Sequence, residues 1–251
     1  MEPTDNTGKA GPSTRAPDRA HDAAAPVAAD VAGDHPFGPH AAAILATEHW
    51  SLLGTRSLIW NEALNRATVF LTVLSASIIA LALLADATGF GSHTTTLALV
   101  LLPVVLLLGI ATYVRQVQIN NEEFQLVLAM NRLRHAYLKI EPGLEPYFTT
   151  GHHDDEHGLV ATYMLDHPSR RWLVVHFLIN TPTIVATVDA ALAAAIAVLV
   201  LQAVEAPRAA VVAGGVVAFL ALWGGLMPLQ RHTVDPLRNT PPRFPTPPDI
   251  S

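Results

Sequence analysis

The residues best suited to chemistry lie in one short stretch, 151–158, which reads GHHDDEHG. Within it, His153 to His157 forms an H-x-x-E-H pattern, the inverted zinc-protease motif, in which two histidines ligate zinc and a glutamate takes part in the chemistry. Such an enzyme also needs a third ligand from elsewhere in the fold and a cleft that excludes water. Here glycines bracket the pattern, and the sequence offers ligands from this one segment.

The stretch therefore has three interpretations. The first is a metal-binding membrane enzyme built on the loop 152–157. The second is a weak divalent-cation site formed by His152, His153, Asp154 and His157. The third is a solvated polar loop in which Asp154 or Asp155 caps a helix over 157–165. We favour the third, and we expect no catalytic residue, no cofactor and no enzymatic activity.

A second candidate is Asp189, the only charged residue inside the long apolar stretches of the chain. An aspartate in the middle of a membrane span costs about 2.5–3.5 kcal/mol, so it faces protein or water rather than lipid. Its depth in the span matches that of Thr72 and Ser75, and we expect one of these hydroxyls to hydrogen-bond it. Glycines 224 and 225 of another span are expected to lie alongside. Two roles stay open: a helix-to-helix contact, and an ion or proton site.

The composition places these residues in a membrane protein. Of the 251 residues, 51% are hydrophobic and 14% are charged, against roughly 25% charged in an average soluble domain. The chain has no cysteine, which excludes disulfides, thiolate metal sites and cysteine nucleophiles. The net charge of −6 gives no support to nucleic-acid binding.

Four apolar stretches are long enough to cross a bilayer: Ala67–Ala85, Thr96–Val114, Thr183–Val204 and Ala209–Leu229. The shortest would span about 28 Å at 1.5 Å per residue, close to the ~30 Å hydrocarbon core. We therefore predict an all-α, polytopic membrane protein with two transmembrane hairpins, 67–114 and 183–229. Of the 15 Lys and Arg residues, 14 lie outside the two short links between paired spans. The positive-inside rule then places both termini and the central loop in the cytoplasm, and the bacterial inner membrane is the expected location.

The remaining segments complete the domain plan. Residues 1–40 and 230–251 are rich in proline, and both are expected to be disordered. Residues 41–66 form a cytosolic amphipathic helix, and 115–182 form a cytosolic helical segment and loop. In the latter, the second span continues as one helix until Pro142.

Residues 41–66 carry apolar positions along two adjoining helical lines. One line contains Leu45, Leu52 and Ile59, and the other contains Leu53, Trp60 and Leu64. We expect this helix to pack on the one that follows the second span, giving a small cytosolic helical layer.

Four short stretches carry a resemblance to a known group: 48–53 (EHWSLL), 56–62 (RSLIWNE), 131–137 (NRLRHAY) and 146–150 (PYFTT). They resemble bacterial integral membrane proteins of unassigned function, over about residues 44–230. The resemblance implies a four-span membrane fold and supplies no catalytic residue. A looser similarity, at the level of the fold, is to SLATT-type membrane effector domains, whose proposed activity is membrane permeabilisation.

We therefore expect a non-enzymatic membrane protein that acts through helix association, with itself as a homo-oligomer or with a protein partner that the sequence does not identify. Small residues at four-residue spacing in the last two spans favour close helix packing: Ala186, Ala190 and Ala194 in one, Ala210, Gly214 and Ala218 in the other. Beyond the lipid bilayer no further ligand is expected, and no nucleic acid is expected as a partner. The alternative is a small channel, pore or proton-coupled transporter that uses Asp189.

Overall fold

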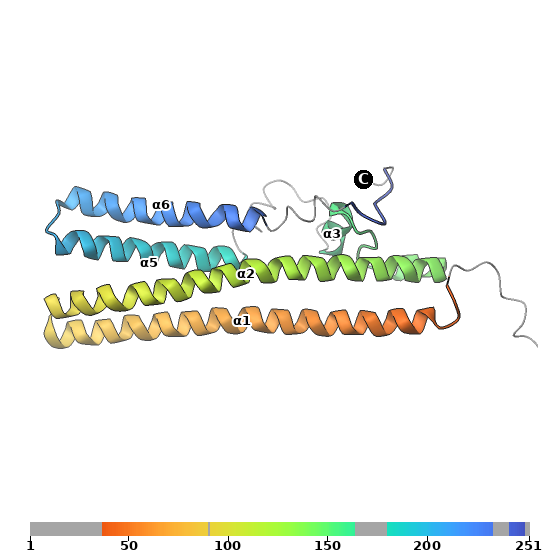
Figure 1. The fold of residues 1–251 in the computed structure, drawn as a ribbon, viewed down its shortest axis with the longest axis horizontal. Coiled ribbons are helices and arrows are strands. Elements are labelled where there is room, and N and C mark those ends of the chain that lie inside the picture. The colour runs from red at the N-terminus through yellow and green to blue at the C-terminus, as the bar shows by residue number, and fades with distance from the viewer. Residues whose placement is uncertain (1–36, 90, 164–179, 233–240, 249–251) are drawn as a thin grey trace, which may run out of the picture. The chain divides into compact units, whose positions relative to one another are not determined.

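The computed structural model describes residues 37–89, 91–163, 180–232 and 241–248. The chain divides into two compact units, Met1–Gly38 and Pro39–Ser251, and every element below belongs to the second. The described residues contain helices and no strand (Figure 1). In chain order these are α1 (Ala41–Thr88), α2 (Ser92–Ile140), the 3-10 helix η1 (Pro142–Tyr147), α3 (Glu156–Thr162), α5 (Thr181–Ala203) and α6 (Arg208–His232).

The two longest helices, α1 and α2, contain 48 and 49 residues. At 1.5 Å per residue each is about 70 Å long, more than twice the ~30 Å hydrocarbon core of a bilayer. Each apolar stretch therefore continues into the amphipathic segment beside it as one helix. Beyond Ile110, α2 runs without a glycine or proline to Ile140 and ends before Pro142, as the sequence predicts.

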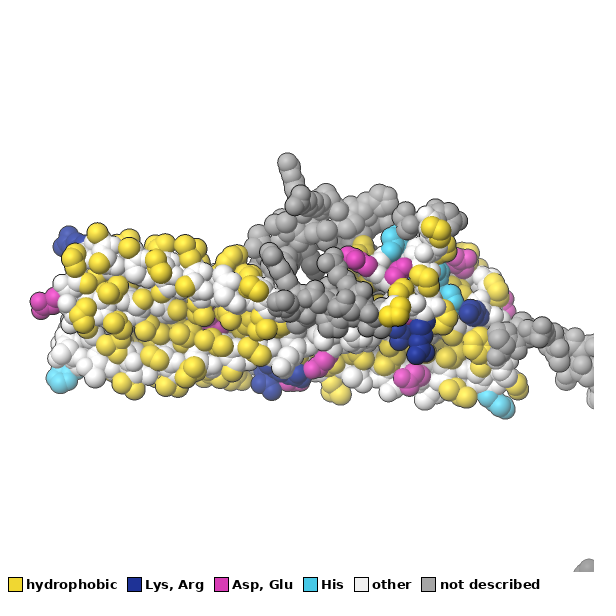
Figure 2. Space-filling view, turned by 45° about the horizontal axis from the view of Figure 1, so that its top comes forward, with side chains coloured by type: hydrophobic (Ala, Val, Ile, Leu, Met, Phe, Trp, Pro, Cys, Tyr) yellow, Lys and Arg dark blue, Asp and Glu magenta, His cyan; other side chains and the backbone are white. Residues whose placement is uncertain are grey.

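Four helices are long and apolar enough to cross a membrane: α1, α2, α5 and α6 as far as Gln230. The four apolar stretches identified in the sequence lie within them, apart from Val204 directly after α5. On the face shown in Figure 2, apolar side chains cover the half of the molecule that contains α5 and α6. Charged side chains gather over the other half and at the far tip. The helices thus indicate a membrane-spanning protein.

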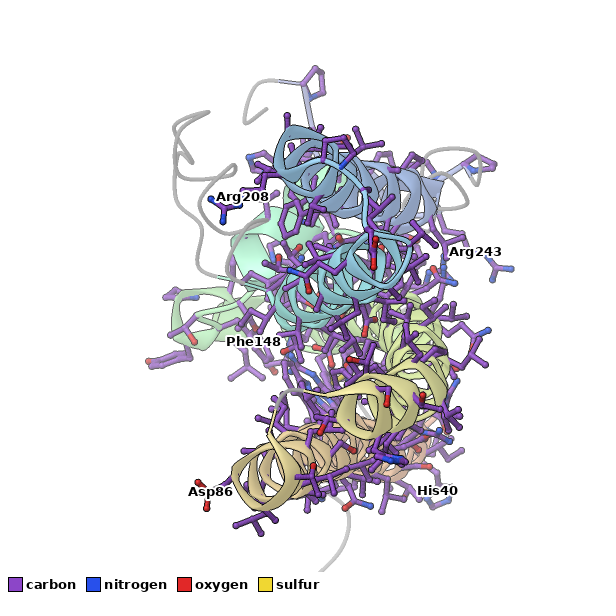
Figure 3. All side chains as sticks on the ribbon, turned by 90° about the vertical axis from the view of Figure 1, so that its left-hand side faces the viewer. His40, Asp86, Phe148, Arg208 and Arg243 are labelled. Carbon is purple, nitrogen blue, oxygen red and sulfur yellow. The ribbon has the colours of Figure 1, made fainter. Side chains whose placement is uncertain are left out.

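The four long helices pack in the order α1, α2, α5, α6, which the end view in Figure 3 shows. Their core contains Phe70 of α1, Val105 and Tyr113 of α2, Ala186 of α5 and Leu226 of α6. Tyr113 is fully buried, and its hydroxyl donates to the carbonyl oxygen of Leu226 at 2.6 Å. Because α1 packs chiefly on α2, one long side of α1 has no neighbour among the described helices.

Side chains next to the first turn cap two of the helices, α5 and α3. Asn180 caps α5, because its side chain accepts from the backbone N–H of Thr183, and Pro182 occupies the first turn. Asp155 caps α3 in the same way, which confirms one of the two capping residues expected for that loop. The helix it starts ends at Thr162, and residues 164–179 lie outside the described residues.

The expectation of a disordered C-terminal tail does not hold for all of its length. Helix α6 continues to His232, and residues 241–248 are described and hydrogen-bonded to the loop before α3. Prolines favour an extended chain without internal hydrogen bonds, so its backbone N–H groups stay free for carboxylate acceptors elsewhere. Of the predicted N-terminal disordered segment, residues 1–36 lie outside the described residues.

Candidate functional sites

Asp189 lies on the side of α5 that packs against α2. The residue is fully buried, and neither carboxyl oxygen has a hydrogen-bond partner among the described residues. The side chain rests on the α2 backbone at Gly109, where an added methyl group would overlap the Asp189 carboxyl group and the Phe70 ring. The absence of a side chain at Gly109 thus makes room for a carboxyl group between three helices.

The structure does not bring Asp189 to the residues expected beside it. Thr72 and Ser75 lie on the exposed side of α1. Thr72 donates its hydroxyl hydrogen to the carbonyl oxygen of Thr68 at 2.8 Å. Gly224 and Gly225 are also uninvolved, since added Cβ atoms there would meet nothing within 4 Å. Depth along a span does not decide a contact, because the rotation of each helix about its own axis selects which residues meet.

The loop before α3 holds the C-terminal segment through Asp154, which is 5% exposed. The Asp154 carboxylate accepts from Arg132 Nε at 2.7 Å and from the backbone N–H groups of Phe244 at 2.7 Å and Arg243 at 3.0 Å. Burial alone would raise the pKa of Asp154, but these hydrogen bonds together hold it below its usual range. The carboxylate therefore acts as a charged acceptor for an extended backbone.

Asp155 adds a second clamp on the same segment. Besides capping α3, its carboxylate accepts from the hydroxyl of Thr246 at 2.9 Å and from the backbone N–H of that residue. The loop itself is fastened to α2 by the fully buried Asn131, whose amide donates to the carbonyl oxygens of His153 at 2.8 Å and Gly158 at 3.1 Å. Two adjacent carboxylates on a fixed loop thus position residues 241–248.

Aromatic rings complete this docking site. Phe244 stacks on His135 of α2, with ring centroids 4.2 Å apart, and Lys139 Nζ lies 5.0 Å from the centroid of the same phenyl ring. His152 and His153 lie beside this pair, with their own centroids 4.2 Å apart. Burial, followed by the positive charge of Lys139, lowers the pKa of His135, and burial followed by His153 lowers that of His152.

The four residues considered as metal ligands are divided among different contacts. His152 and His153 lie together, Asp154 bonds the C-terminal segment, and His157 is exposed on α3. Among the described residues, no group of three or more His, Asp or Glu side chains is arranged to hold a metal ion. The loop serves as a binding surface for the chain's own backbone in this structure.

Ion pairs join α1 to α2 just beyond the apolar stretches. Arg115 of α2 bridges Glu62 of α1 at 2.9 Å and Glu122 at 2.7 Å, while Arg56 of α1 pairs with Glu123 at 2.6 Å. The hydrogen bond from Arg115 is the main cause that lowers the pKa of Glu62 to about 2. The sequence alone did not indicate the two pairs between α1 and α2, because their partners are 53 and 67 residues apart.

The side of α1 without a neighbour carries an apolar stripe outside the apolar spans. We name Trp50, Leu53, Ser57, Trp60 and Leu64 the α1 stripe. Its large apolar side chains are 37–74% exposed, and their spacing alternates between three and four residues.

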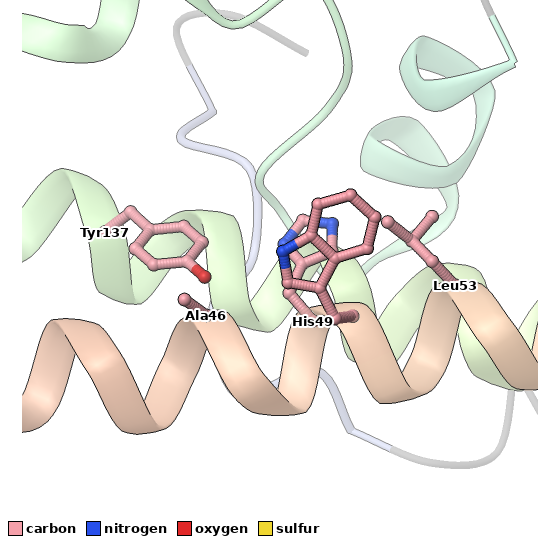
Figure 4. A pocket seen from close by; sticks show the side chains of 5 residues that line it. Ala46, His49, Leu53 and Tyr137 are labelled. Carbon is pink, nitrogen blue, oxygen red and sulfur yellow. The ribbon is translucent and has the colours of Figure 1, made fainter.

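Near its beginning, the α1 stripe borders a shallow hollow between α1 and α2 (Figure 4). Ala46, His49, Trp50 and Leu53 line the hollow from α1, and Tyr137 lines it from α2, stacked on the His49 ring at 6.0 Å between centroids.

Comparison with protein-family models, curated proteins and solved structures finds no match to this chain.

Proposed function

We propose that this chain is a non-enzymatic integral membrane protein that acts through helix association. In this proposal, residues 67–114 and 183–229 form two transmembrane hairpins. The extensions of α1 and α2 form a helical layer in the cytoplasm, and both termini lie on the same side. The placement of 14 of the 15 Lys and Arg residues outside the two links supports this orientation in a bacterial inner membrane.

The observation that carries the proposal is the α1 stripe. Apolar side chains in the span are covered by lipid, but the α1 stripe precedes residue 67 and faces water in a single chain. Trp50 is 74% exposed and Leu64 is 56% exposed on the same side of the helix. Contiguous exposed apolar residues on a soluble surface mark sites of protein association. Tryptophan is also enriched among the residues that contribute most to such interfaces.

The proposal predicts that the protein forms a complex that depends on the α1 stripe. Extracted from membranes in a mild detergent, the wild-type chain is expected in a particle whose protein mass exceeds the 26.8 kDa of one chain. Trp60→Gln is expected to lower that mass to one chain. The matched control is Leu58→Gln, which replaces a 71% exposed apolar residue on another side of α1 and is expected to leave the mass unchanged. A wild-type protein that carries no associated chain would contradict the proposal.

A second function, proton or ion passage, is favoured by Asp189. A buried carboxyl group that has no hydrogen-bond partner among the described residues is costly within the apolar half of the helices, and such residues mark proton and ion pathways in transporters. Its test is proton and ion flux in liposomes that contain the purified protein. Flux that Asp189→Asn abolishes, in a variant that keeps its thermal stability, would favour this function over association. A metal-dependent enzyme has less support, because the carboxylates of Asp154 and Asp155 already bind the C-terminal backbone.

A further inference from the structure

We propose that the partner of the α1 stripe is a second copy of this chain, placed parallel to the first, so that two α1 helices pair along their stripes. This inference rests on the proposed function, because it names the partner of the same surface. The pair would place α1 of each copy at the centre and α2 of each copy outside it.

The first support is that α1 carries two apolar lines, whereas among the described helices it packs chiefly on α2. Leu52 and Ile59 are partly buried, and Ala63 and Phe70 are buried on the side that packs against α2. The α1 stripe lies about 100° around the helix from this line, since successive residues are about 100° apart. A repeat that alternates between three and four residues is the seam along which helices pair side by side. The helix is therefore patterned for two helical neighbours, and α2 supplies one.

The second support is the direction that a membrane imposes. All copies of one chain share one topology, so two neighbouring α1 helices run parallel and enter the bilayer at the same height. Each stripe residue then faces its own equivalent, which is the arrangement of a symmetric dimer.

The third support is that the edges of the α1 stripe do not repel an identical copy. On one edge lie Thr47, Gly54 and Asn61, which carry no charge. On the other edge, Arg56 is paired with Glu123 at 2.6 Å, so its charge is compensated within the chain. Above Gly54 an added Cβ would meet nothing within 4 Å, which leaves room for a neighbouring side chain beside the tryptophans.

The fourth support is that the same side of α1 continues uncovered into the span. Leu71 is 45% exposed and Ile78 is 55% exposed, with the exposed hydroxyl residue Ser75 between them. Hydroxyl side chains in membrane helices commonly lie at helix-to-helix contacts. From Trp50 to Ile78 the surface is about 42 Å long at 1.5 Å per residue. A contact of this length allows each helix to bury nearly the roughly 800 Å² of surface per partner that is typical of a stable protein interface.

The test uses the absence of native cysteine. Ser57→Cys places one thiol in the middle of the α1 stripe of the full chain. Mild oxidation in native membranes is expected to convert it to a disulfide-linked dimer. The matched control, Ser51→Cys, makes the same substitution at an exposed position about 120° around the helix, and it is expected to stay a monomer. Adding Leu53→Glu to Ser57→Cys is expected to abolish the dimer, while circular dichroism verifies that the helices persist.

The outcomes separate the dimer from the proposed function. Ser57→Cys that does not cross-link, or Ser51→Cys that cross-links to the same extent, would overturn the pairing of α1 with α1. A complex with a different protein that Leu53→Glu disrupts would also overturn the second copy, yet it would leave helix association standing. A chain that forms neither a dimer nor another stripe-dependent complex would overturn both.

Discussion

At the scale of single residues, a buried carboxyl group depends on the one neighbour that has no side chain. Asp189 occupies the space that a side chain at Gly109 would fill, with Phe70 closing the same space from α1. The contact joins α2 to α5, the two helices at the middle of the packing order. A change at Gly109 therefore acts on three helices at once.

Gly109→Ala is expected to destabilise the protein by about 1–3 kcal/mol, because the added methyl group forces a well-packed interface apart. Thermal unfolding in detergent measures the effect. Gly224→Ala is the matched control: that glycine has nothing within 4 Å of an added Cβ, so stability is expected to stay the same or to rise slightly. Equal melting temperatures for wild type and Gly109→Ala would show that Asp189 does not occupy this space.

At the scale of elements, the C-terminal segment connects the end of α6 to the far part of α2. Two carboxylates on the loop before α3 accept hydrogen bonds from the backbone N–H groups of Arg243, Phe244 and Thr246. The Phe244 ring stacks on His135, whose pKa lies below its usual range chiefly because it is buried. Docking of residues 241–248 is thus linked to protonation, because the docked and released states hold protons differently.

The docked segment is expected to loosen as the pH falls from about 7.5 to about 5.5. Burial is the main cause that lowers the pKa of His135 in the docked state, and release of Phe244 uncovers the ring, so the released state binds a proton more readily and is favoured below the usual histidine value of 6.5. The nearby Asp154 has a lowered pKa and keeps its charge in this window. Faster hydrogen exchange of the Phe244 amide at the lower pH, relative to its intrinsic rate, measures the release.

His135→Phe provides the control, since it keeps a ring beside Phe244 and removes one titrating group. The variant is expected to show a weaker dependence of exchange on pH, with His152 and His153 as the remaining titratable neighbours. An amide that exchanges at the same relative rate at both pH values in the wild type would contradict the linkage. A dependence confined to values below about 4 would assign it to the carboxylates instead.

At the scale of the whole molecule, the sequence predicts those features that depend on residues close together in the chain. The four long apolar helices follow from uninterrupted apolar runs, and the end of α2 follows from Pro142. The neighbours of Asp189 and the partners of Asp154 depend on helix rotation and on contacts between distant segments, such as the 90 residues between Asp154 and Phe244. No local spacing encodes those contacts. The α1 stripe lies between these cases, because its periodicity is visible in the sequence while its exposure required the position of α2.

The proposed orientation of the four spans has a direct test in the cysteine-free chain. The link between α1 and α2 contains no Lys or Arg, whereas the extension of α1 contains Arg56 and Arg66, so the link is expected to face outward. Ser92→Cys lies at the start of α2 beside the link, and its exposed thiol should react with a membrane-impermeant reagent in intact cells. Ser51→Cys, exposed on the extension of α1, should react only after lysis. Labelling of Ser51→Cys in intact cells, with Ser92→Cys protected, would reverse the topology and place the α1 stripe outside the cytoplasm.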